Sequence, residues 1–262
     1  MKSVLEFKAR KASGPKISMV SAYTHWEARF LADSPVDCIL VGDSLAVVID
    51  GEPQTFSATV EIMARHTRAV VRGAGGKLVI ADFPFLAARK GVPAAVDCAA
   101  ELLRAGAHAV KVEGVDGHED VLGHLVGSGV PVIGHLGLTP QSIHAFGGYK
   151  VQGRGGEGAA ELIRQARAIE SAGCFGLVLE CVPANVAAEV TAAVGIPTIG
   201  IGAGPDTDGQ VLVFHDLLGL NPGFGARFVR HFADGGTVVN AGLAAFAHAV
   251  AKGDYPAKKE SY

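Results

Sequence analysis

Short apolar segments recur along the chain, and each precedes a longer segment whose apolar residues repeat at helical spacing. The short segments are rich in β-branched residues and predict strands, whereas the Ala-rich segments between them predict amphipathic helices. The predicted strands are 17–22, 38–42, 78–81, 109–112, 130–134, 176–179, 198–201 and 211–214. The predicted helices are 25–32, 60–72, 94–105, 119–126, 158–171 and 185–193, and residues 221–252 are expected to be helical as well.

This alternation of strands and helices predicts an α/β fold with a parallel sheet. Eight repeats without a Pro/Ser-rich linker or a shift in composition favour one closed barrel over two smaller domains. We therefore interpret residues 1–262 as a single (β/α)8 TIM barrel domain with extra C-terminal helices.

One connection, residues 135–156, breaks the pattern of short loops. Its sequence, HLGLTPQSIHAFGGYKVQGRGG, is glycine-rich and exceeds the roughly 12–15 residues of an ordinary loop. Loops of this length in compact domains are usually lids or binding loops. Within it, residues 147–154 are expected to form either a lid over a binding site or a contact between subunits.

Composition and charge restrict the possible partners. The 262 residues are 49% hydrophobic, which is enough for a large core, and 26 acidic residues nearly balance 23 basic ones. The basic residues are scattered, so we expect no nucleic acid partner. The first residues lack the apolar core of a signal peptide and no apolar run approaches about 18 residues, so we expect a cytoplasmic protein without a membrane partner. The four cysteines show no zinc-ligand spacing and are expected to be reduced core residues.

Polar residues stand at the carboxyl ends of the predicted strands. They are Asp43 with Ser44, Asp82, Glu113, His135 and Glu180. Apart from the step across the long connection, their spacing matches one strand–helix unit each, so a closed barrel would gather them at one mouth. Alternation along the strand also directs Lys111 into the barrel just below Glu113. Taken alone, Asp43 is more simply read as a helix cap, and the acids could instead serve separate caps and ion pairs around the rim.

Four carboxylates in a low-dielectric mouth would repel one another and take up protons unless cations offset them. Lys111 alone is not enough, and it could instead form an ordinary ion pair with Glu113. A hard divalent cation is the simplest solution, and Mg²⁺ is favoured because it takes oxygen ligands and leaves positions for a substrate. His135 could contact substrate, orient a ligand or be structural.

Seven motifs resemble a known enzyme family. They are LVGDS at 40–44, ADFPF at 81–85, KVEG at 111–114, GHLGLTPQS at 134–142, FGGYKVQGR at 146–154, VLECVP at 178–183 and IGIGAG at 199–204. In this order they resemble the 3-methyl-2-oxobutanoate hydroxymethyltransferase family, also called ketopantoate hydroxymethyltransferase. The resemblance implies a barrel enzyme that uses Mg²⁺ and 5,10-methylenetetrahydrofolate to hydroxymethylate 3-methyl-2-oxobutanoate, giving 2-dehydropantoate for pantothenate biosynthesis. It also implies a homo-oligomer, namely a decamer.

The resemblance also assigns roles to individual residues. It implies metal ligands at Asp43, Asp82 and Glu113, and substrate contacts at Asp43, Ser44, Asp82 and Lys111. Glu180 becomes the catalytic base that removes the C3 proton while the metal stabilises the enolate. The sequence departs from the family's usual pattern at Thr24, Ala46, Leu86 to Ala88 and Val115. None of these departures removes a proposed ligand or the base, but they bear on the rim geometry and the folate contacts.

Other functions remain open at this stage. The nearest alternative is a Mg²⁺-dependent C–C bond lyase that cleaves a small oxoacid or phospho-acid in a related barrel. Gly200, Gly202 and Gly204 follow the seventh strand, where such barrels often bind phosphate, so a phosphate-binding enzyme is a further alternative. An inactive barrel kept as a scaffold or ligand-binding subunit is disfavoured, because the acids, Lys111 and Glu180 are all present.

Overall fold

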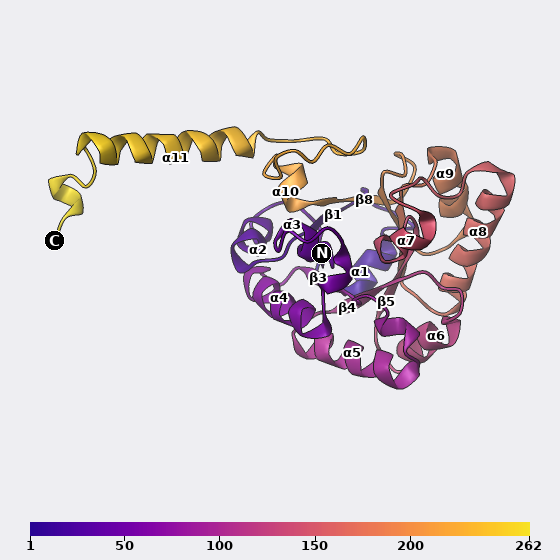
Figure 1. Cartoon of the computed structure of the whole chain (residues 1–262). Coiled ribbons are helices and arrows are strands. Elements are labelled where there is room, and N and C mark those ends of the chain that lie inside the picture. The colour runs from indigo at the N-terminus through magenta and orange to yellow at the C-terminus, as the bar shows by residue number, and fades with distance from the viewer. The chain divides into compact units, whose positions relative to one another are not determined.

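The computed structural model describes all 262 residues and contains a closed barrel of eight parallel strands (Figure 1). The strands are β1 Ile17–Ser21, β2 Cys38–Val41, β3 Leu78–Asp82, β4 Ala109–Glu113, β5 Val132–Gly137, β6 Gly176–Glu180, β7 Thr198–Ile201 and β8 Gly209–Val213. They pair in chain order, and β8 closes on β1. The predicted (β/α)8 TIM barrel is confirmed.

The helices follow the strands in the order that the sequence predicts. They are α1 Val4–Ala9, α2 His25–Ala32, α3 Leu45–Val48, α4 Val60–Gly73, α5 Val92–Arg104, α6 Glu119–Gly127, α7 Ile143–Phe146, α8 Gly155–Ser171, α9 Ala184–Ala193, α10 Phe214–Leu217 and α11 Gly235–Lys252. Among them, α2, α4, α5, α6, α8 and α9 contact one another in sequence and surround the strands (Figure 1). Helix α4 illustrates how the helices pack on the strands. Its Met63, Ala64 and Val70 are fully buried on one face, as expected of an amphipathic helix on a sheet.

Alternate strand residues fill the inside of the barrel. One buried apolar cluster contains Met19, Cys38, Leu40, Ile80, Ala109, Ile133, Val178, Ile199 and Val211. Because side chains alternate along a strand, residues two positions further on continue the same inward rows. Those positions are Asp82 after Ile80, Lys111 and Glu113 after Ala109, His135 after Ile133, and Glu180 after Val178. The inward rows therefore change from apolar to charged at the carboxyl ends of the strands.

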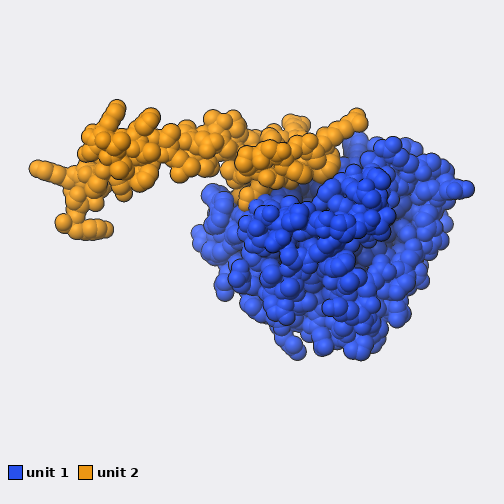
Figure 2. All heavy atoms as spheres, viewed as in Figure 1, with its two compact units in different colours: residues 1–213 blue, residues 214–262 orange.

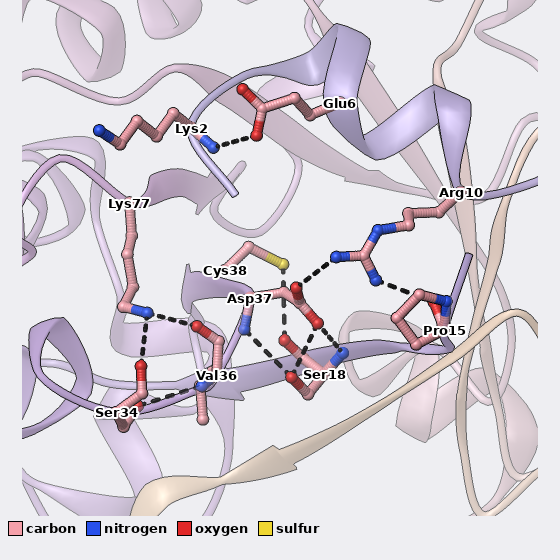
Figure 3. Close-up of polar contacts among 10 residues, drawn as sticks. All are labelled: Lys2, Glu6, Arg10, Pro15, Ser18, Ser34, Val36, Asp37, Cys38 and Lys77. Carbon is pink, nitrogen blue, oxygen red and sulfur yellow. Dashed lines mark hydrogen bonds and ion pairs between the residues drawn. The ribbon is translucent and has the colours of Figure 1, made fainter. Parts of the chain in front are cut away.

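Helix α1 closes the amino-terminal end of the barrel. Phe7 is 0% exposed, and its ring meets that of Phe175, next to β6, edge-on at 5.2 Å between centroids. Just beyond α1, Arg10 Nη2 lies 2.9 Å from Asp37 Oδ1. The other oxygen of Asp37 accepts hydrogen bonds of 2.9 Å from both the backbone N–H and the hydroxyl of Ser18 (Figure 3). The start of the barrel is thus held by apolar packing and by a carboxylate whose oxygens both have partners.

The chain forms two compact units, residues 1–213 and 214–262 (Figure 2). The first contains the whole barrel; the second contains α10, an irregular connection and α11.

The sequence predicted helix throughout 221–252, which is wrong for residues 221–234. Pro222, Gly223 and Gly225 lie in that stretch and disfavour a helix. The last predicted strand is also shifted, because Phe214 begins α10 instead of ending β8. A single-domain organisation stays a prediction, and none of the helices combines the length and apolarity of a membrane span.

Candidate active site

The carboxyl ends of β3, β4 and β5 bring buried charged side chains together around Lys111. Its Nζ lies 3.1 Å from Asp82 Oδ1, 3.7 Å from Glu113 Oε1 and 3.0 Å from His135 Nδ1. The Lys111, Asp82 and Glu113 side chains are only 5%, 3% and 5% exposed. With Asp43, which hydrogen-bonds Asp82, these residues form one connected group. We call Asp43, Asp82 and Glu113 the acid cluster.

Asp43 reaches the acid cluster through a turn. Cys38 and Leu40 point into the barrel, so the next inward position along β2 is Gly42 and not Asp43. The strand ends at Val41, and the backbone N–H of Asp43 then donates to Asp82 Oδ2 at 3.1 Å. A Cβ on Gly42 would lie 2.7 Å from Ser44 Oγ and 3.6 Å from Asp82 Oδ2. Glycine therefore leaves the space in which the turn places Asp43 and Ser44.

Gln141, from the turn after β5, completes the surroundings of the acid cluster. Its side-chain Nε2 donates to Asp43 Oδ2 at 2.9 Å, and its backbone N–H donates to Glu113 Oε2 at 3.1 Å. By contrast, Asp82 Oδ1 faces Lys111 Nζ at 3.1 Å, and Glu113 Oε1 faces Lys111 Nζ at 3.7 Å and His135 Nδ1 at 3.4 Å. Each of the two acids thus has one oxygen held by a neutral N–H group and one oxygen that faces the Lys111 ammonium.

Burial makes the charged forms of these acids costly. It raises the pKa of Asp43 to about 6, with the Glu113 charge adding to the effect. It raises the pKa of Asp82 to about 7, although the Lys111 ammonium opposes it, and it raises that of Glu113 as well. Burial alone would lower the pKa of Lys111, but the three carboxylates raise it. The lysine is therefore firmly charged, and one ammonium does not stabilise three carboxylates fully.

His135 connects the acid cluster to Glu180. Burial, together with the Lys111 charge, lowers the pKa of His135 to about 4, so the ring is neutral at neutral pH. A lysine ammonium has only donors, so Nδ1 accepts its hydrogen bond and the ring proton resides on Nε2. Nε2 lies 3.3 Å from Glu180 Oε2. Glu180 is 17% exposed, so it is the carboxylate of this group with access to the mouth.

The connection after β5 lies beside Glu180. The backbone N–H of Gln152 donates to the carbonyl of Cys181 at 3.0 Å. Tyr149 in this connection is 64% exposed, and partial burial together with the charges of Glu180 and Asp43 raises its pKa. Cys181 itself has a backbone φ of 48°, and burial raises the pKa of its thiol to about 11. The thiol is therefore protonated at neutral pH, which disfavours a nucleophilic role. The lid or subunit-contact role of residues 147–154 stays a prediction.

Sequence reasoning did not single out Gln141 or Tyr23. The Tyr23 hydroxyl lies 2.8 Å from Ser44 Oγ, and the side chain is fully buried. Gln141 lies inside the GHLGLTPQS motif, but its contact with Asp43 spans 98 positions of the chain. The only sequence signal for Gln141 was that a polar residue stands within a distinctive motif. The contact between Gln141 and Asp43 follows only from the backbone path of the connection after β5.

The acid cluster has the donor chemistry of a divalent cation site. No group of three or more His, Cys, Asp or Glu side chains is already arranged as a metal centre. The donors nevertheless fit, because three buried carboxylates face one ammonium and Mg²⁺ often takes only one or two carboxylates from protein. Three carboxylates and one ammonium leave two negative charges, which a divalent cation offsets. The assignment of Asp43, Asp82 and Glu113 as ligands stays a prediction.

Comparison with known proteins identifies the family. A sequence model described as ketopantoate hydroxymethyltransferase matches residues 2–258, almost the whole chain. The chain belongs to the ketopantoate hydroxymethyltransferase family. It is therefore an enzyme of the transferase class, and the resemblance carried by its seven motifs is confirmed.

Curated ketopantoate hydroxymethyltransferases, named 3-methyl-2-oxobutanoate hydroxymethyltransferase, match over their full length. The protein from Bdellovibrio bacteriovorus is 50% identical over 262 residues, which cover 100% of both chains. The one from Francisella tularensis subsp. novicida is 45% identical and covers 100% of this chain and 99% of its own. The one from Coxiella burnetii is 48% identical over 252 residues, which cover 96% of this chain and 95% of its own.

Solved structures share the barrel at low identity. Phosphonopyruvate hydrolase has a TM-score of 0.65 at 15% identity, covering 99% of this chain and 93% of its own. A 2,3-dimethylmalate lyase, a member of the PEP mutase/isocitrate lyase superfamily, has a TM-score of 0.64 at 17% identity, covering 100% and 89%. At these identities the likeness establishes the fold alone.

The positions where this sequence departs from the family pattern have ordinary structural roles. The Thr24 side chain caps α2 in a capping box with Glu27, as an aspartate could at the same place. Ala46 is fully buried in α3, and Val115 is 1% exposed. Leu86 has a backbone φ of 60° and is 45% exposed at the rim. These residues lie on or below the rim, whereas the acid cluster, Lys111 and Glu180 are intact.

Proposed function

We propose that the chain transfers a hydroxymethyl group from 5,10-methylenetetrahydrofolate to 3-methyl-2-oxobutanoate and releases 2-dehydropantoate. The observation that carries this proposal is the arrangement of Glu180 and the acid cluster in one mouth, linked through His135 and Lys111. Family membership supports 3-methyl-2-oxobutanoate as the substrate, because the curated relatives are named 3-methyl-2-oxobutanoate hydroxymethyltransferase. The product would serve pantothenate biosynthesis, and we expect the reaction to take place in the cytoplasm.

Each charged residue has a task in this reaction. Lys111 and Ser44 bind the carboxylate and keto oxygens of the oxoacid, together with Asp43 and Asp82. Glu180 removes the C3 proton as general base, and the resulting enolate forms a C–C bond to the methylene carbon of the folate. The C–N bonds of that carbon break to release tetrahydrofolate, and water supplies the hydroxyl oxygen of the product. The partial exposure of Glu180 lets it pass that proton on, and the His135 Nε2–H, 3.3 Å away, orients its carboxylate. His135 thus acts on the base in this proposal, while a direct contact with substrate stays a prediction.

Asp43, Asp82 and Glu113 would hold Mg²⁺ in this proposal. When bound there, the cation supplies electrophilic polarisation of the oxoacid carbonyl, worth several kcal/mol in comparable enzymes. The burial of these three carboxylates around a single ammonium supports the choice of these residues.

A turnover assay tests the proposed function. The pure protein is incubated with Mg²⁺, methylenetetrahydrofolate and 3-methyl-2-oxobutanoate, and 2-dehydropantoate is measured by mass spectrometry. Product that depends on both the folate and the oxoacid is the expected result. If the folate is not consumed and a hydroxy-acid or phospho-acid is cleaved instead, the C–C bond lyase alternative replaces the proposal.

A substitution in the acid cluster tests the metal assignment. Asp82→Ala is expected to weaken Mg²⁺ binding and activity together, by at least about 10-fold, because it removes a ligand and leaves Lys111 without its nearest carboxylate. Isothermal titration with Mg²⁺ measures the first effect, and the turnover assay the second. Glu189→Ala, on the exposed surface of α9, is the matched control. Unchanged Mg²⁺ affinity in Asp82→Ala would remove that residue from the ligand set.

We also propose that the enzyme is a homo-oligomer, and a decamer by its family. Helix α11 supports association with a second copy, since Val239, Leu243, Phe246 and Val250 recur along one face and are 50%, 63%, 57% and 49% exposed. Such a row of apolar side chains seldom stays in water. Analytical ultracentrifugation of the full chain measures the mass directly, and a monomer at micromolar concentration would contradict this proposal.

A further inference from the structure

Gln141 reaches the acid cluster from outside the strands that carry the acids. It lies in the short turn Pro140–Ser142, which follows β5 and opens the long connection. Its backbone N–H donates to Glu113 Oε2, and its side-chain Nε2 donates to Asp43 Oδ2 at 2.9 Å and to the carbonyl of Phe83 at 2.8 Å. One residue therefore joins the ends of β2, β3 and β4 to the turn that follows β5.

The chemistry of the amide makes this contact specific. A glutamine NH₂ group has two N–H donors, and both acceptors here, a carboxylate oxygen and a backbone carbonyl, require donors. Both hydrogens are thus used, so the amide cannot rotate without losing one bond. The Phe83 carbonyl follows directly after Asp82, which ties the amide to the strand that carries the second acid.

Gln141 contacts one oxygen of each of two carboxylates. It donates to Oδ2 of Asp43 and Oε2 of Glu113, while the backbone N–H of Asp43 donates to Oδ2 of Asp82. The other oxygens of Asp82 and Glu113 face the Lys111 ammonium, at 3.1 and 3.7 Å. The neutral N–H donors and the cation therefore contact different oxygens of these two carboxylates.

We propose that Gln141 is a positioning residue: its side-chain amide fixes the orientation of Asp43 relative to Asp82 and Glu113, so that the three carboxylates are arranged to bind a divalent cation. The inference rests on the proposed function, which uses those acids as ligands. Groups that orient metal ligands typically change metal affinity or activity by about 10–100-fold when removed. The same bond also makes the acid cluster depend on the conformation of the connection after β5.

Gln141→Met tests this inference, because it keeps the length of the side chain and removes only the amide. The backbone bond to Glu113 remains in the variant. Gln165→Met is the matched control, since Gln165 lies on α8 away from the mouth and its amide donates to Asp116 Oδ2 at 2.6 Å and Glu161 Oε1 at 3.2 Å. Gln141→Asn, whose amide is one methylene too short, provides a second variant should Gln141→Met lose thermal stability.

Two measurements are made on each protein: Mn²⁺ affinity by electron paramagnetic resonance, and kcat/KM in the turnover assay with Mg²⁺. Both are expected to fall about 10–100-fold in Gln141→Met at an unchanged melting temperature, and to stay within about twofold of wild type in Gln165→Met. Wild-type Mn²⁺ affinity in Gln141→Met overturns the inference, as does an equal loss in both variants. If wild type itself binds no Mn²⁺ and forms no 2-dehydropantoate, the proposed function fails; if wild type does both, only the role of Gln141 is at stake.

Discussion

The two ends of the barrel both hold carboxylates that are at most 20% exposed, but they compensate them differently. At the amino-terminal end, Asp37 has Arg10 at 2.9 Å and two donors from Ser18 (Figure 3). Asp208 repeats the arrangement, with Lys11 at 3.0 Å and the backbone N–H and hydroxyl of Thr198 at 2.8 and 3.1 Å. Each of these acids thus has its own cation and its own pair of donors.

At the carboxyl-terminal end, three acids share Lys111. Two of their oxygens are buried without a hydrogen bond, and burial raises the pKa values of Asp43 and Asp82. A fully satisfied carboxylate contributes to folding, whereas an incompletely compensated one retains the capacity to bind a cation or substrate. The two ends therefore differ as the proposed function requires: the acids of the amino-terminal end are individually compensated, and those of the carboxyl-terminal end, where barrel enzymes place their active sites, are not.

Substitution of the proposed base, Glu180, is the sharpest test of this difference between the two ends of the barrel. Glu180→Gln removes the proton acceptor but keeps the shape of the side chain, so exchange of the C3 proton of 3-methyl-2-oxobutanoate is expected to fall by at least about 10². Proton NMR in D₂O with Mg²⁺ and without folate measures that exchange. Glu189→Gln, an exposed acid on α9, serves as control and should exchange at the wild-type rate. Wild-type exchange in Glu180→Gln would exclude Glu180 as the base.

At the opposite end, Phe7→Ala is expected to have the largest effect on stability. Phe7 is 0% exposed against Phe175, and deleting a buried aromatic ring lowers the free energy of unfolding by about 3–5 kcal/mol. Chemical denaturation measures this loss, while kcat/KM of the folded protein should stay at the wild-type value. Leu5→Ala, on the same helix but 77% exposed, should change stability by less than about 0.5 kcal/mol. A fall in kcat/KM for Phe7→Ala would contradict the division between the two ends.

Asp37→Ala should have a smaller effect in the same direction. Its removal leaves the Ser18 donors and Arg10 without their acceptor, at a cost of about 1–3 kcal/mol, or about 2–4 °C in melting temperature per kcal/mol. Glu101→Ala is the control, because the Arg68–Glu101 pair is 48% and 41% exposed and should contribute less than about 1 kcal/mol. Equal melting temperatures for the two variants would show that Asp37 is no better compensated than a surface acid.

The sequence predicted the barrel well because its signals are local. Strand and helix periodicity needs only neighbouring residues, and one error, the helix expected over 221–234, arose where Pro222 and adjacent glycines outweighed an otherwise suitable composition. The same alternation correctly directs Asp82, Lys111 and Glu113 toward the mouth, because each continues an inward row of its strand.

The remaining contacts of the site depend on backbone paths that periodicity does not describe. Asp43 does not follow the inward row of β2, which continues with Gly42, and it reaches Asp82 only because the chain turns after Val41. Gln141 meets Asp43 through the course of the connection after β5. The sequence therefore predicts which acids gather at the mouth, but it does not predict the groups that orient them.

Tyr23→Phe should have the smallest effect. It tests whether the site at the carboxyl-terminal end of the barrel extends to Tyr23. The Tyr23 hydroxyl is 2.8 Å from Ser44 Oγ, and losing one such bond costs about 0.5–1.5 kcal/mol. If Ser44 contacts the oxoacid, this should appear as a rise in KM of about 2–10-fold with little change in kcat, because the substitution leaves Glu180 and the acid cluster untouched. Tyr255→Phe, a 47% exposed tyrosine in residues 214–262, is the control. A Tyr23→Phe enzyme with wild-type KM would mean that Ser44 does not need this partner to meet its substrate.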